Sequence, residues 1–539
     1  MAQRFSLRSG RAGNLAYRSG LLVVGFLIGG LLTHVLAGCV GANSAQAVFG
    51  LGRLFDDLGS EAEKELSRFQ DVYLEVSTTD NPQQLEHFRN AFSKVRTQYV
   101  QPVVDADLID AAIEGLRLYK PEEGKEQTDR HLVEAALDAM MEKLDPHSSY
   151  LNPQEFKEMQ VTTQGQFGGL GILVTLDKES GAVKVISPID DTPAFRAGLK
   201  ANDLITHLDG KAVKGKKLTD AVRVMRGKPG TSIRLTVLRG ENDVFDVTLR
   251  RDIVHVKAVK WRAEGDIGYI RVSRFSQTTD EGTVEAIEAL RAEIGPKLKG
   301  YVLDLRNNPG GLLSESVTLA DSFLDEGQVV SVRGRDGRNG RDHNAKWGDL
   351  ARGLPIVVLI NEGSASASEI VAAALQDHRR ATVMGARSFG KGSVQVVSRL
   401  DLEGALKLTT DLYYVPSGRA IQGVGVLPDI VLQASAKKED KSSAKAASED
   451  ETSEAEVDAK TEAEAEEHRA RREADLPNAL KVDHGQERQA KVTLSEDRCP
   501  PAGEEGKDKA LGCALAYLHS GSTPGFLTAV KATDEAGIH

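Results

Sequence analysis

The stretch that decides the fold is residues 361–395, NEGSASASEIVAAALQDHRRATVMGARSFGKGSVQ. Its alternating Ser/Ala run leads into an apolar helical pattern, IVAAALQ. A strand-like ATVMG follows, and Lys391 then lies between two glycines. A serine at a helix start lies beside N–H groups without intrahelical partners, which suits a nucleophile whose product is an oxyanion. A lysine in an apolar pocket loses its charge more easily and can act as a general base. The stretch therefore predicts a Ser–Lys acyl-transfer site.

Three other interpretations of this stretch stay open from its residues alone. GARSFGKG resembles a phosphate-binding P-loop, but Gly392 stands where that motif has Ser or Thr, and the following SVQVVSRL has a strand pattern. Ser388 and Lys391 fit the S-x-x-K spacing of penicillin-binding enzymes, although the neighbouring glycines disfavour the helical turn that this motif needs. The third interpretation is that the serines only cap a helix and the lysine lies in a turn.

Four further motifs occur in order along the chain: LDPHSSYL (144–151), QGQFGGLGI (164–172), LDLRNNPGGLL (303–313) and LTTDLYYVPSGRAIQ (408–422). Together with the first stretch they resemble the carboxyl-terminal processing peptidases, which are serine endopeptidases with a PDZ domain before the catalytic core. The resemblance covers about residues 90 to 435. It implies that Ser366 is the nucleophile, Lys391 the base and Gln395 the residue that completes the site. It also implies a multidomain fold: an α/β protease core of the crotonase/ClpP-like type, an inserted β-rich PDZ domain and a helical N-terminal part.

The composition limits the class of protein. The chain has 539 residues, of which 40% are hydrophobic, so we expect several domains with proper cores. A formal net charge of −11 argues against nucleic acid as a partner. Cys39, Cys499 and Cys513 have no metal-ligand spacing, so we expect neither a metal nor another cofactor.

The N-terminus predicts export. Residues 1–19 carry four arginines and no acidic residue, and residues 20–37 are almost wholly apolar, so residues 1–38 are expected to be a signal peptide or a membrane anchor. Leu-Ala-Gly before Cys39 resembles a bacterial lipobox and makes Cys39 a lipidation candidate, whereas Ala-Gln-Ala at 45–47 offers a rival cleavage site. Whether the N-terminus is lipidated at Cys39, cleaved after Ala47 or kept as an uncleaved anchor, the bulk of the chain is expected outside the cytoplasm. We expect it on the periplasmic side of the envelope, tethered to the membrane by an anchor or a lipid.

The region before the PDZ-like module is expected to be helical. Residues 39–90 are interpreted as a connector, and residues 91–157 carry amphipathic runs such as FRNAFSKVRTQYV and HLVEAALDAMMEKL. His147 follows Pro146 in a turn, where we expect it to cap or to form hydrogen bonds and not to serve as the partner of the nucleophile.

Residues 158–250 resemble a PDZ domain, with strand patterns in GAVKVISPI and SIRLTVLR and a helical pattern in LTDAVRVMRG. Such domains bind a peptide's free carboxylate on the backbone N–H groups of a glycine loop and add the peptide as an extra strand. Gly169, Leu170, Gly171 and Ile172 form the corresponding loop here, where glycine lets the backbone approach the carboxylate closely.

Residues 251–435 alternate strand and helix patterns, which predicts an α/β core. Within it, GYVLDLRNNPGGLL indicates a strand, a turn and then a helix. As in the family, Gly310 and Gly311 are expected to present N–H groups toward Ser366 and to form the oxyanion hole with the N–H of Ala367.

The C-terminal part has two sections. Residues 436–475 contain few large apolar residues and are expected to be an acidic low-complexity linker. Residues 476–539 return to a mixed composition and end in a predicted helix. Cys499 and Cys513 are disulfide candidates, because export exposes thiols to oxidation, and a bridge there would stabilise the segment by roughly 3 kcal/mol in the chain-entropy model.

These features predict a serine endopeptidase of the cell envelope that binds protein C-terminal tails through its PDZ domain and cleaves through an acyl-enzyme. A non-catalytic PDZ adaptor is the alternative, against which the intact Ser366, Lys391 and Gln395 argue. The expected partners are protein substrates with accessible C-terminal tails and the membrane. A homo-oligomer or an activating partner stays open.

Overall fold

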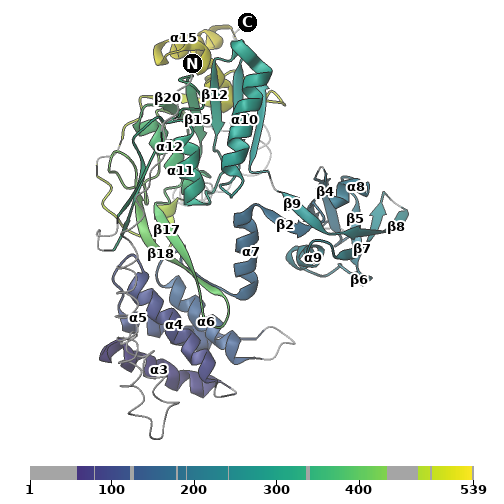
Figure 1. Ribbon diagram of the computed structural model, residues 1–539, viewed down its shortest axis with the longest axis vertical. Coiled ribbons are helices and arrows are strands. Elements are labelled where there is room, and N and C mark those ends of the chain that lie inside the picture. Colours follow the sequence, from purple (N-terminus) through teal and green to yellow (C-terminus); the bar gives the residue numbers. More distant parts are fainter. Residues whose placement is uncertain are drawn as a thin grey trace, which may run out of the picture. The chain divides into compact units, whose positions relative to one another are not determined.

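A computed structural model describes residues 58–433 and 472–536, except residues 78, 80, 122–126, 178–179, 190, 241, 256, 336–339, 347 and 486–487 (Figure 1). Contacts divide the chain into two units, Met1–Ser67 and Arg68–His539, and the features described below belong to the second. The expected leader, Cys39 and residues 436–471 of the expected linker lie outside the described residues. Among the described helices, none combines the length and the apolar content that crossing a bilayer requires.

The N-terminal region is helical. Its elements are α3 (Ser60–Val76), which crosses the division between the units, α4 (Pro82–Gln98), α5 (Asp105–Leu118), α6 (Asp129–Glu142), β1 (Ser149–Leu151) and α7 (Pro153–Gln164). The side chains of Asn81 and Thr128 cap α4 and α6, which satisfies N–H groups that have no partner inside the helix. Strand β1 pairs with β18 (Ala405–Tyr414), and this pairing attaches the LDPHSSYL motif to the core.

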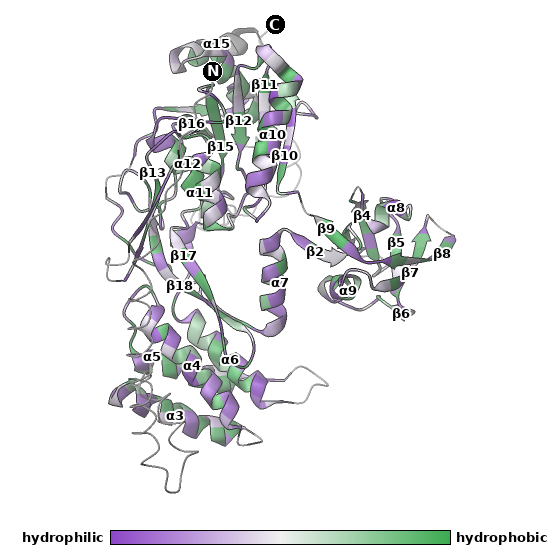
Figure 2. Ribbon diagram, in the orientation of Figure 1, coloured by the Kyte–Doolittle hydropathy of each residue, from purple (hydrophilic) through white to green (hydrophobic). Residues whose placement is uncertain are grey.

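The core contains a seven-stranded sheet in the order β10-β11-β12-β15-β16-β19-β20. The strands are β10 (Val259–Glu264), β11 (Ile267–Val272), β12 (Gly300–Asp304), β15 (Ile356–Ile360), β16 (Ala381–Gly385), β19 (Ile430–Gln433) and β20 (Val492–Ser495). All neighbouring pairs are parallel except β10 and β11. Strand β15 reads IVVLI, is buried throughout and carries the hydrophobic colour in Figure 2, as expected for a parallel strand covered on both faces.

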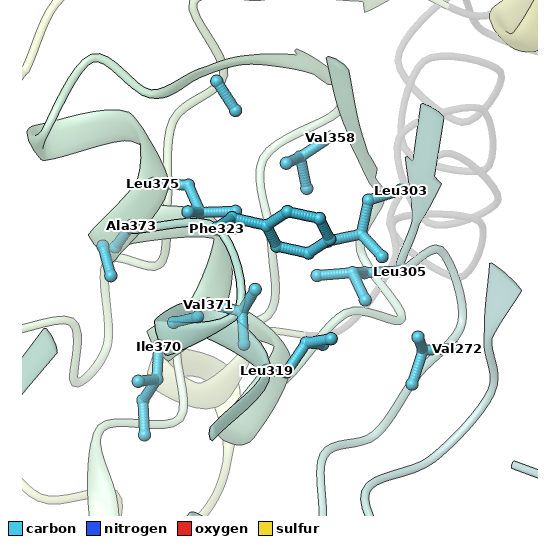
Figure 3. Close-up of a cluster of buried hydrophobic side chains, with 14 of the residues drawn as sticks. Val272, Leu303, Leu305, Leu319, Phe323, Val358, Ile370, Val371, Ala373 and Leu375 are labelled. Carbon is cyan, nitrogen blue, oxygen red and sulfur yellow. The ribbon is translucent and has the colours of Figure 1, made fainter. Parts of the chain in front are cut away.

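Helices cover both faces of this sheet because side chains of a strand alternate between the faces. Leu303 and Val358 belong to the cluster shared with α10 (Thr279–Ile294), α11 (Leu313–Asp321) and α12 (Ala367–Asp377). Their neighbours Val302 and Val357 belong to a second cluster, shared with α14 (Lys509–Ser520). Figure 3 shows the ring of Phe323 beside Leu303 and near Leu375 of α12, so packing fixes α12, which begins directly after Ser366, on the sheet.

The core contains a second sheet, which has five strands. Its order is β1-β18-β13-β14, and β17 also pairs with β18. The strands not yet given are β13 (Gln328–Gly334), β14 (Arg341–Asn344) and β17 (Ser393–Arg399). The glycine-rich loop with Lys391 connects β16 of the first sheet to β17 of the second, so the lysine lies where the two sheets meet.

The PDZ domain is inserted between α7 and the core. A two-stranded antiparallel ribbon of β2 (Gln166–Gly169) and β9 (Asp252–His255) leads into it and out of it. Its other elements are β3 (Ile172–Leu176), β4 (Val183–Pro188), α8 (Pro193–Arg196), β5 (Leu204–Leu208), β6 (Lys211–Ala212), α9 (Leu218–Met225), β7 (Ser232–Arg239) and β8 (Asp243–Arg250). The domain has its own buried cluster, with Val185, Ile205 and Leu235 at its centre.

The C-terminal segment belongs to the core. It contains η3 (Glu473–Asp475), β20, η4 (Glu496–Arg498), α14 and α15 (Thr523–Ala536). The prediction that the linker extends to residue 475 was wrong at this end, because Glu473 of η3 is fully buried. Strand β20, which the sequence did not predict, lies parallel to β19 with Val492 opposite Ile430. A disulfide joins Cys499 and Cys513, whose Cα atoms are 4.9 Å apart. Both cysteines are buried in the apolar cluster that includes side chains of α14.

Candidate active site

Of the three serines in the Ser/Ala run, only Ser366 is accessible to solvent. Ser364 and Ser368 are fully buried and donate hydrogen bonds to the carbonyl oxygens of Leu305 and Asn308. Ser366 is partly exposed at the N-cap of α12 and has a φ of 55°, which is rare for a residue other than glycine. Such a backbone costs about 1–3 kcal/mol and is held only by strong local contacts.

The contact that holds Ser366 comes from Glu369, a fully buried carboxyl group in the first turn of α12. Its Oε2 accepts from the N–H of Ser366 (2.7 Å) and of Lys391 (2.9 Å). Its Oε1 accepts from the N–H of Gly390 (2.8 Å) and from the hydroxyl of Ser388 (2.6 Å). One side chain therefore joins the backbone of the predicted nucleophile to the backbone of the predicted base.

Burial raises the pKa of Glu369 to about 7, against the four hydrogen bonds that favour its ionised form. The hydroxyl of Ser388 is buried and also accepts from the N–H of Val426. Residues 386–392 form no helical turn, so the S-x-x-K interpretation lacks the geometry that it requires.

Lys391 is largely buried, and its Nζ donates to Oε1 of Gln395 at 2.5 Å. Burial, together with the charge of Lys407, lowers the pKa of Lys391 to about 8, while Glu473, Glu369 and Asp145 oppose the shift. A substantial part of this lysine is consequently neutral near pH 8, as a general base must be.

Gln395 is oriented by a network that reaches the LDPHSSYL motif. Its Nε2 donates to the hydroxyls of Ser393 (3.0 Å) and Thr409 (3.1 Å). The hydroxyl of Thr409 donates to Asp145 at 3.1 Å, and Asp145 also accepts from the hydroxyl of Ser148 at 2.6 Å. No role was predicted for Asp145, Ser148 and Thr409, although the motifs that contain them were recognised.

The buried phenol of Tyr413 lies between the two predicted dyad residues. It donates to the carbonyl oxygen of Lys391 and is within hydrogen-bonding reach of the Ser366 side chain. Burial raises its pKa well above the ordinary value, so the phenol stays protonated. Within the described chain, Ser366 Oγ and Lys391 Nζ share no hydrogen bond. A neutral amine that donates to Gln395 still has a lone pair for the serine proton.

Of the two glycines after β12, Gly310 lies against Ser366 and Gly311 lies against Phe275. A Cβ on Gly310 would approach that of Ser366 to 2.8 Å, so glycine is needed for this close packing. The N–H of Gly310 already donates to Asn308 Oδ1 at 2.9 Å, contrary to the expectation that it points to the reacting carbonyl. In the described chain the N–H groups of Gly311 and Ala367 donate no hydrogen bond, which leaves them available to an oxyanion.

In the structure, the loop of the PDZ domain that was predicted to bind a carboxylate is shorter than the four residues assigned to it. Gly169 ends β2 and Ile172 begins β3, so Leu170 and Gly171 alone form the loop. Their N–H groups donate no hydrogen bond within the described chain, while the carbonyl oxygen of Leu170 accepts from Ala194 of α8 and that of Gly171 accepts from Ile189, directly after β4. Gly171 has a φ of 75°, and a Cβ there would lie 2.2 Å from Thr192.

His147 does not contact the predicted dyad. Its Nε2 lies 2.7 Å from Oε2 of Glu473, a fully buried carboxylate of the C-terminal segment that sequence reasoning missed. Among the described residues, no group of three or more His, Cys, Asp or Glu side chains is arranged to hold a metal ion.

Comparison with known proteins agrees with this architecture. The family model described as peptidase family S41 matches residues 266–432, and the PDZ domain model matches residues 168–249. A carboxy-terminal-processing protease of Bartonella bacilliformis is 49% identical over 368 residues, 67% of this chain and 79% of that protein. A CtpA-like serine protease of Staphylococcus aureus is 38% identical, over 57% of this chain and 61% of that protein. The solved structure of a photosystem II D1 C-terminal processing protease is 28% identical, with 66% of this chain and 93% of that chain covered and a TM-score of 0.40. The extent of the first match shows that this chain belongs to peptidase family S41, as a serine-type carboxy-terminal-processing protease with a PDZ domain.

Proposed function

We propose that this protease cleaves protein substrates with a Ser366–Lys391 dyad and a covalent acyl-enzyme. The observation that carries the proposal is the carboxyl group of Glu369, which accepts from the N–H groups of both Ser366 and Lys391. Two residues that are 25 positions apart are thereby fixed at one point, the lysine with a pKa lowered to about 8.

The chemistry follows from these positions. Neutral Lys391 takes the proton of the Ser366 hydroxyl while Oγ forms a bond to the scissile carbonyl carbon. The N–H groups of Gly311 and Ala367 stabilise the oxyanion. Collapse breaks the C–N bond, and the Lys391 ammonium returns the proton to the leaving amine. Water, deprotonated by Lys391, then attacks the ester and releases a carboxylate and free Ser366. Gln395 orients the amine throughout.

Covalent labelling tests this proposal directly. A fluorophosphonate should add its phosphonyl group to Ser366, so that mass spectrometry finds the adduct on the peptide containing residues 361–377. Ser366→Ala should remove the adduct. An adduct of equal yield on another serine, in the wild type and in Ser366→Ala alike, would contradict the assignment of the nucleophile.

We propose that the PDZ domain selects substrates by their C-terminal carboxylate, with the N–H groups of Leu170 and Gly171 as donors. A peptide with a free C-terminus should be cleaved with a kcat/KM roughly tenfold higher than its amidated form, because the charge-assisted hydrogen bonds are lost on amidation. The matched control is a protein from which residues 168–249 are deleted, which should cleave both forms equally. Equal cleavage of the two peptides by the full chain would contradict carboxylate selection.

We also propose that the enzyme acts on the periplasmic side of the envelope, tethered by its N-terminus. The support is the arginine-rich start, the apolar residues 20–37 and the Leu-Ala-Gly-Cys sequence ending at Cys39. Cys39→Ser should move the protein from the membrane fraction to the soluble periplasmic fraction if a lipid is the tether. Retention in the membrane with unchanged electrophoretic mobility would indicate an uncleaved anchor instead.

A further inference from the structure

The chain returns to the catalytic loop after residue 471, beyond the part that matches the protease family, and brings Glu473 with it. Glu473 is fully buried, which is costly for a carboxylate unless its oxygens are hydrogen-bonded. Both of its oxygens have partners: Oε1 accepts from Gln422 Nε2 and Oε2 pairs with His147 Nε2, each at 2.7 Å. Three separate parts of the chain, which contain residues 147, 422 and 473, therefore meet at this carboxyl group.

Glu473 also holds residues on either side of Lys391, through its backbone N–H and through Gln422. The N–H of Glu473 donates to the carbonyl oxygen of Phe389 at 3.1 Å. Gln422, which Glu473 orients, accepts from the N–H of Gly392 at 2.8 Å with its other amide atom. Residues 389 and 392 are therefore both held through Glu473, whereas Glu369 accepts from the N–H groups of residues 390 and 391.

We propose that Glu473 is a positioning residue for the base: it fixes the loop that carries Lys391 and supplies a negative charge that sets the protonation of the lysine. The inference rests on the dyad of the proposed function, in which Lys391 must be neutral to act. It makes the C-terminal segment part of the catalytic apparatus, since a residue 82 positions after Lys391 would then control it.

Five charged or titratable groups, from four places in the chain, surround Lys391. They are Lys407 and Tyr413 on β18, Glu369 on α12, Asp145 before β1, and Glu473. Lys407 lowers the pKa of Lys391, whereas Glu473, Glu369 and Asp145 oppose that shift, with Glu473 first among the three. Removing the charge of Glu473 should accordingly lower the pKa of the lysine further and move the acidic limb of activity to lower pH.

The test is the pH dependence of fluorophosphonate labelling of Ser366 in the full chain, which needs no knowledge of the natural substrate. Glu473→Gln keeps a group that can bond to Gln422 and His147 but loses the charge. The pH at which labelling is half-maximal (the midpoint) should be lower in Glu473→Gln than in the wild type, by roughly half a pH unit or more. Glu473→Asp keeps the charge on a shorter side chain, so it should keep the wild-type midpoint and label more slowly.

Asp475→Asn is the matched control, because Asp475 lies exposed in the same 3-10 turn and its side chain accepts from the N–H of Arg472. It should leave both the midpoint and the rate unchanged. An unchanged midpoint in Glu473→Gln would overturn the inference. So would unfolding of Glu473→Gln while Asp475→Asn stays folded, since Glu473 would then be only structural. Absence of labelling at Ser366 in the wild type would instead overturn the proposed dyad, which separates the two failures.

Discussion

Lys391→Ala and Lys391→Arg should each lower kcat/KM by roughly a thousandfold or more on a protein substrate such as β-casein. Alanine removes the base, and arginine keeps a charge that cannot be lost in this pH range. In the wild type, activity should rise about tenfold per pH unit below pH 8, because burial and the charge of Lys407 lower the pKa of Lys391 to about 8. Steady-state kinetics between pH 5.5 and 9.5 would measure both effects.

The matched variant for this experiment is Ser366→Ala, which should be as inactive as Lys391→Ala while keeping the thermal unfolding temperature of the wild type. The double variant should be no worse than either single one, because the two residues act as a unit. Substantial activity in Lys391→Arg would contradict the dyad, as would a pH profile that is flat between pH 6 and 9.

Glu369→Gln should lower kcat by roughly a hundredfold, although Glu369 touches no substrate in the proposed mechanism. The amide of glutamine has only one oxygen that can accept. Either the N–H groups of Ser366 and Lys391, which bond to Oε2, or the N–H of Gly390, which bonds to Oε1, therefore lose their acceptor. Unfolding should become easier by roughly 2–3 kcal/mol, since buried donors are left unpaired. Urea denaturation and initial rates would measure the two quantities separately.

Glu315→Gln provides the control for this substitution. Glu315 also lies in the first turn of a core helix and also accepts from a backbone N–H, that of Asp280, and within the described chain no hydrogen bond joins its side chain to Ser366, Lys391 or Gln395. It should keep wild-type kcat and lose little stability. If Glu369→Gln kept kcat within a factor of two, the dyad would not depend on the carboxyl group that joins its two loops.

The elements that follow a local pattern could be predicted from the sequence. ATVMG and SIRLTVLR form β16 and β7 over the expected residues, because alternating or fully buried β-branched runs leave little choice of structure. Ser366, Lys391 and Gln395 were named as site residues from the residue pattern and the family resemblance of their motifs, and their catalytic roles stay a prediction. The structure brings these three residues to one place.

The residues that support them could not be predicted, because their partners are distant in the sequence. Asp145 bonds to Thr409 across 264 residues, and His147 bonds to Glu473 across 326. Neither carboxylate carries a periodicity or a spacing that would separate it from a surface residue. For Gly310 the motif was recognised, but the direction of its N–H could not be predicted, because it depends on the position of the Asn308 side chain.

Strand β20 and helix α14 have a consequence for how this enzyme can be divided. The match to the protease family ends at residue 432, inside β19, yet the next strand of the sheet is supplied by residues 492–495. A fragment cut at the family limit would leave β19 as an unpaired parallel edge and would uncover the apolar side of Val357 and Leu359. Such a fragment should aggregate, whereas a chain nicked between residues 434 and 471 should remain one particle, because the severed halves share a sheet. The end of the recognisable family is therefore not the end of the folding unit.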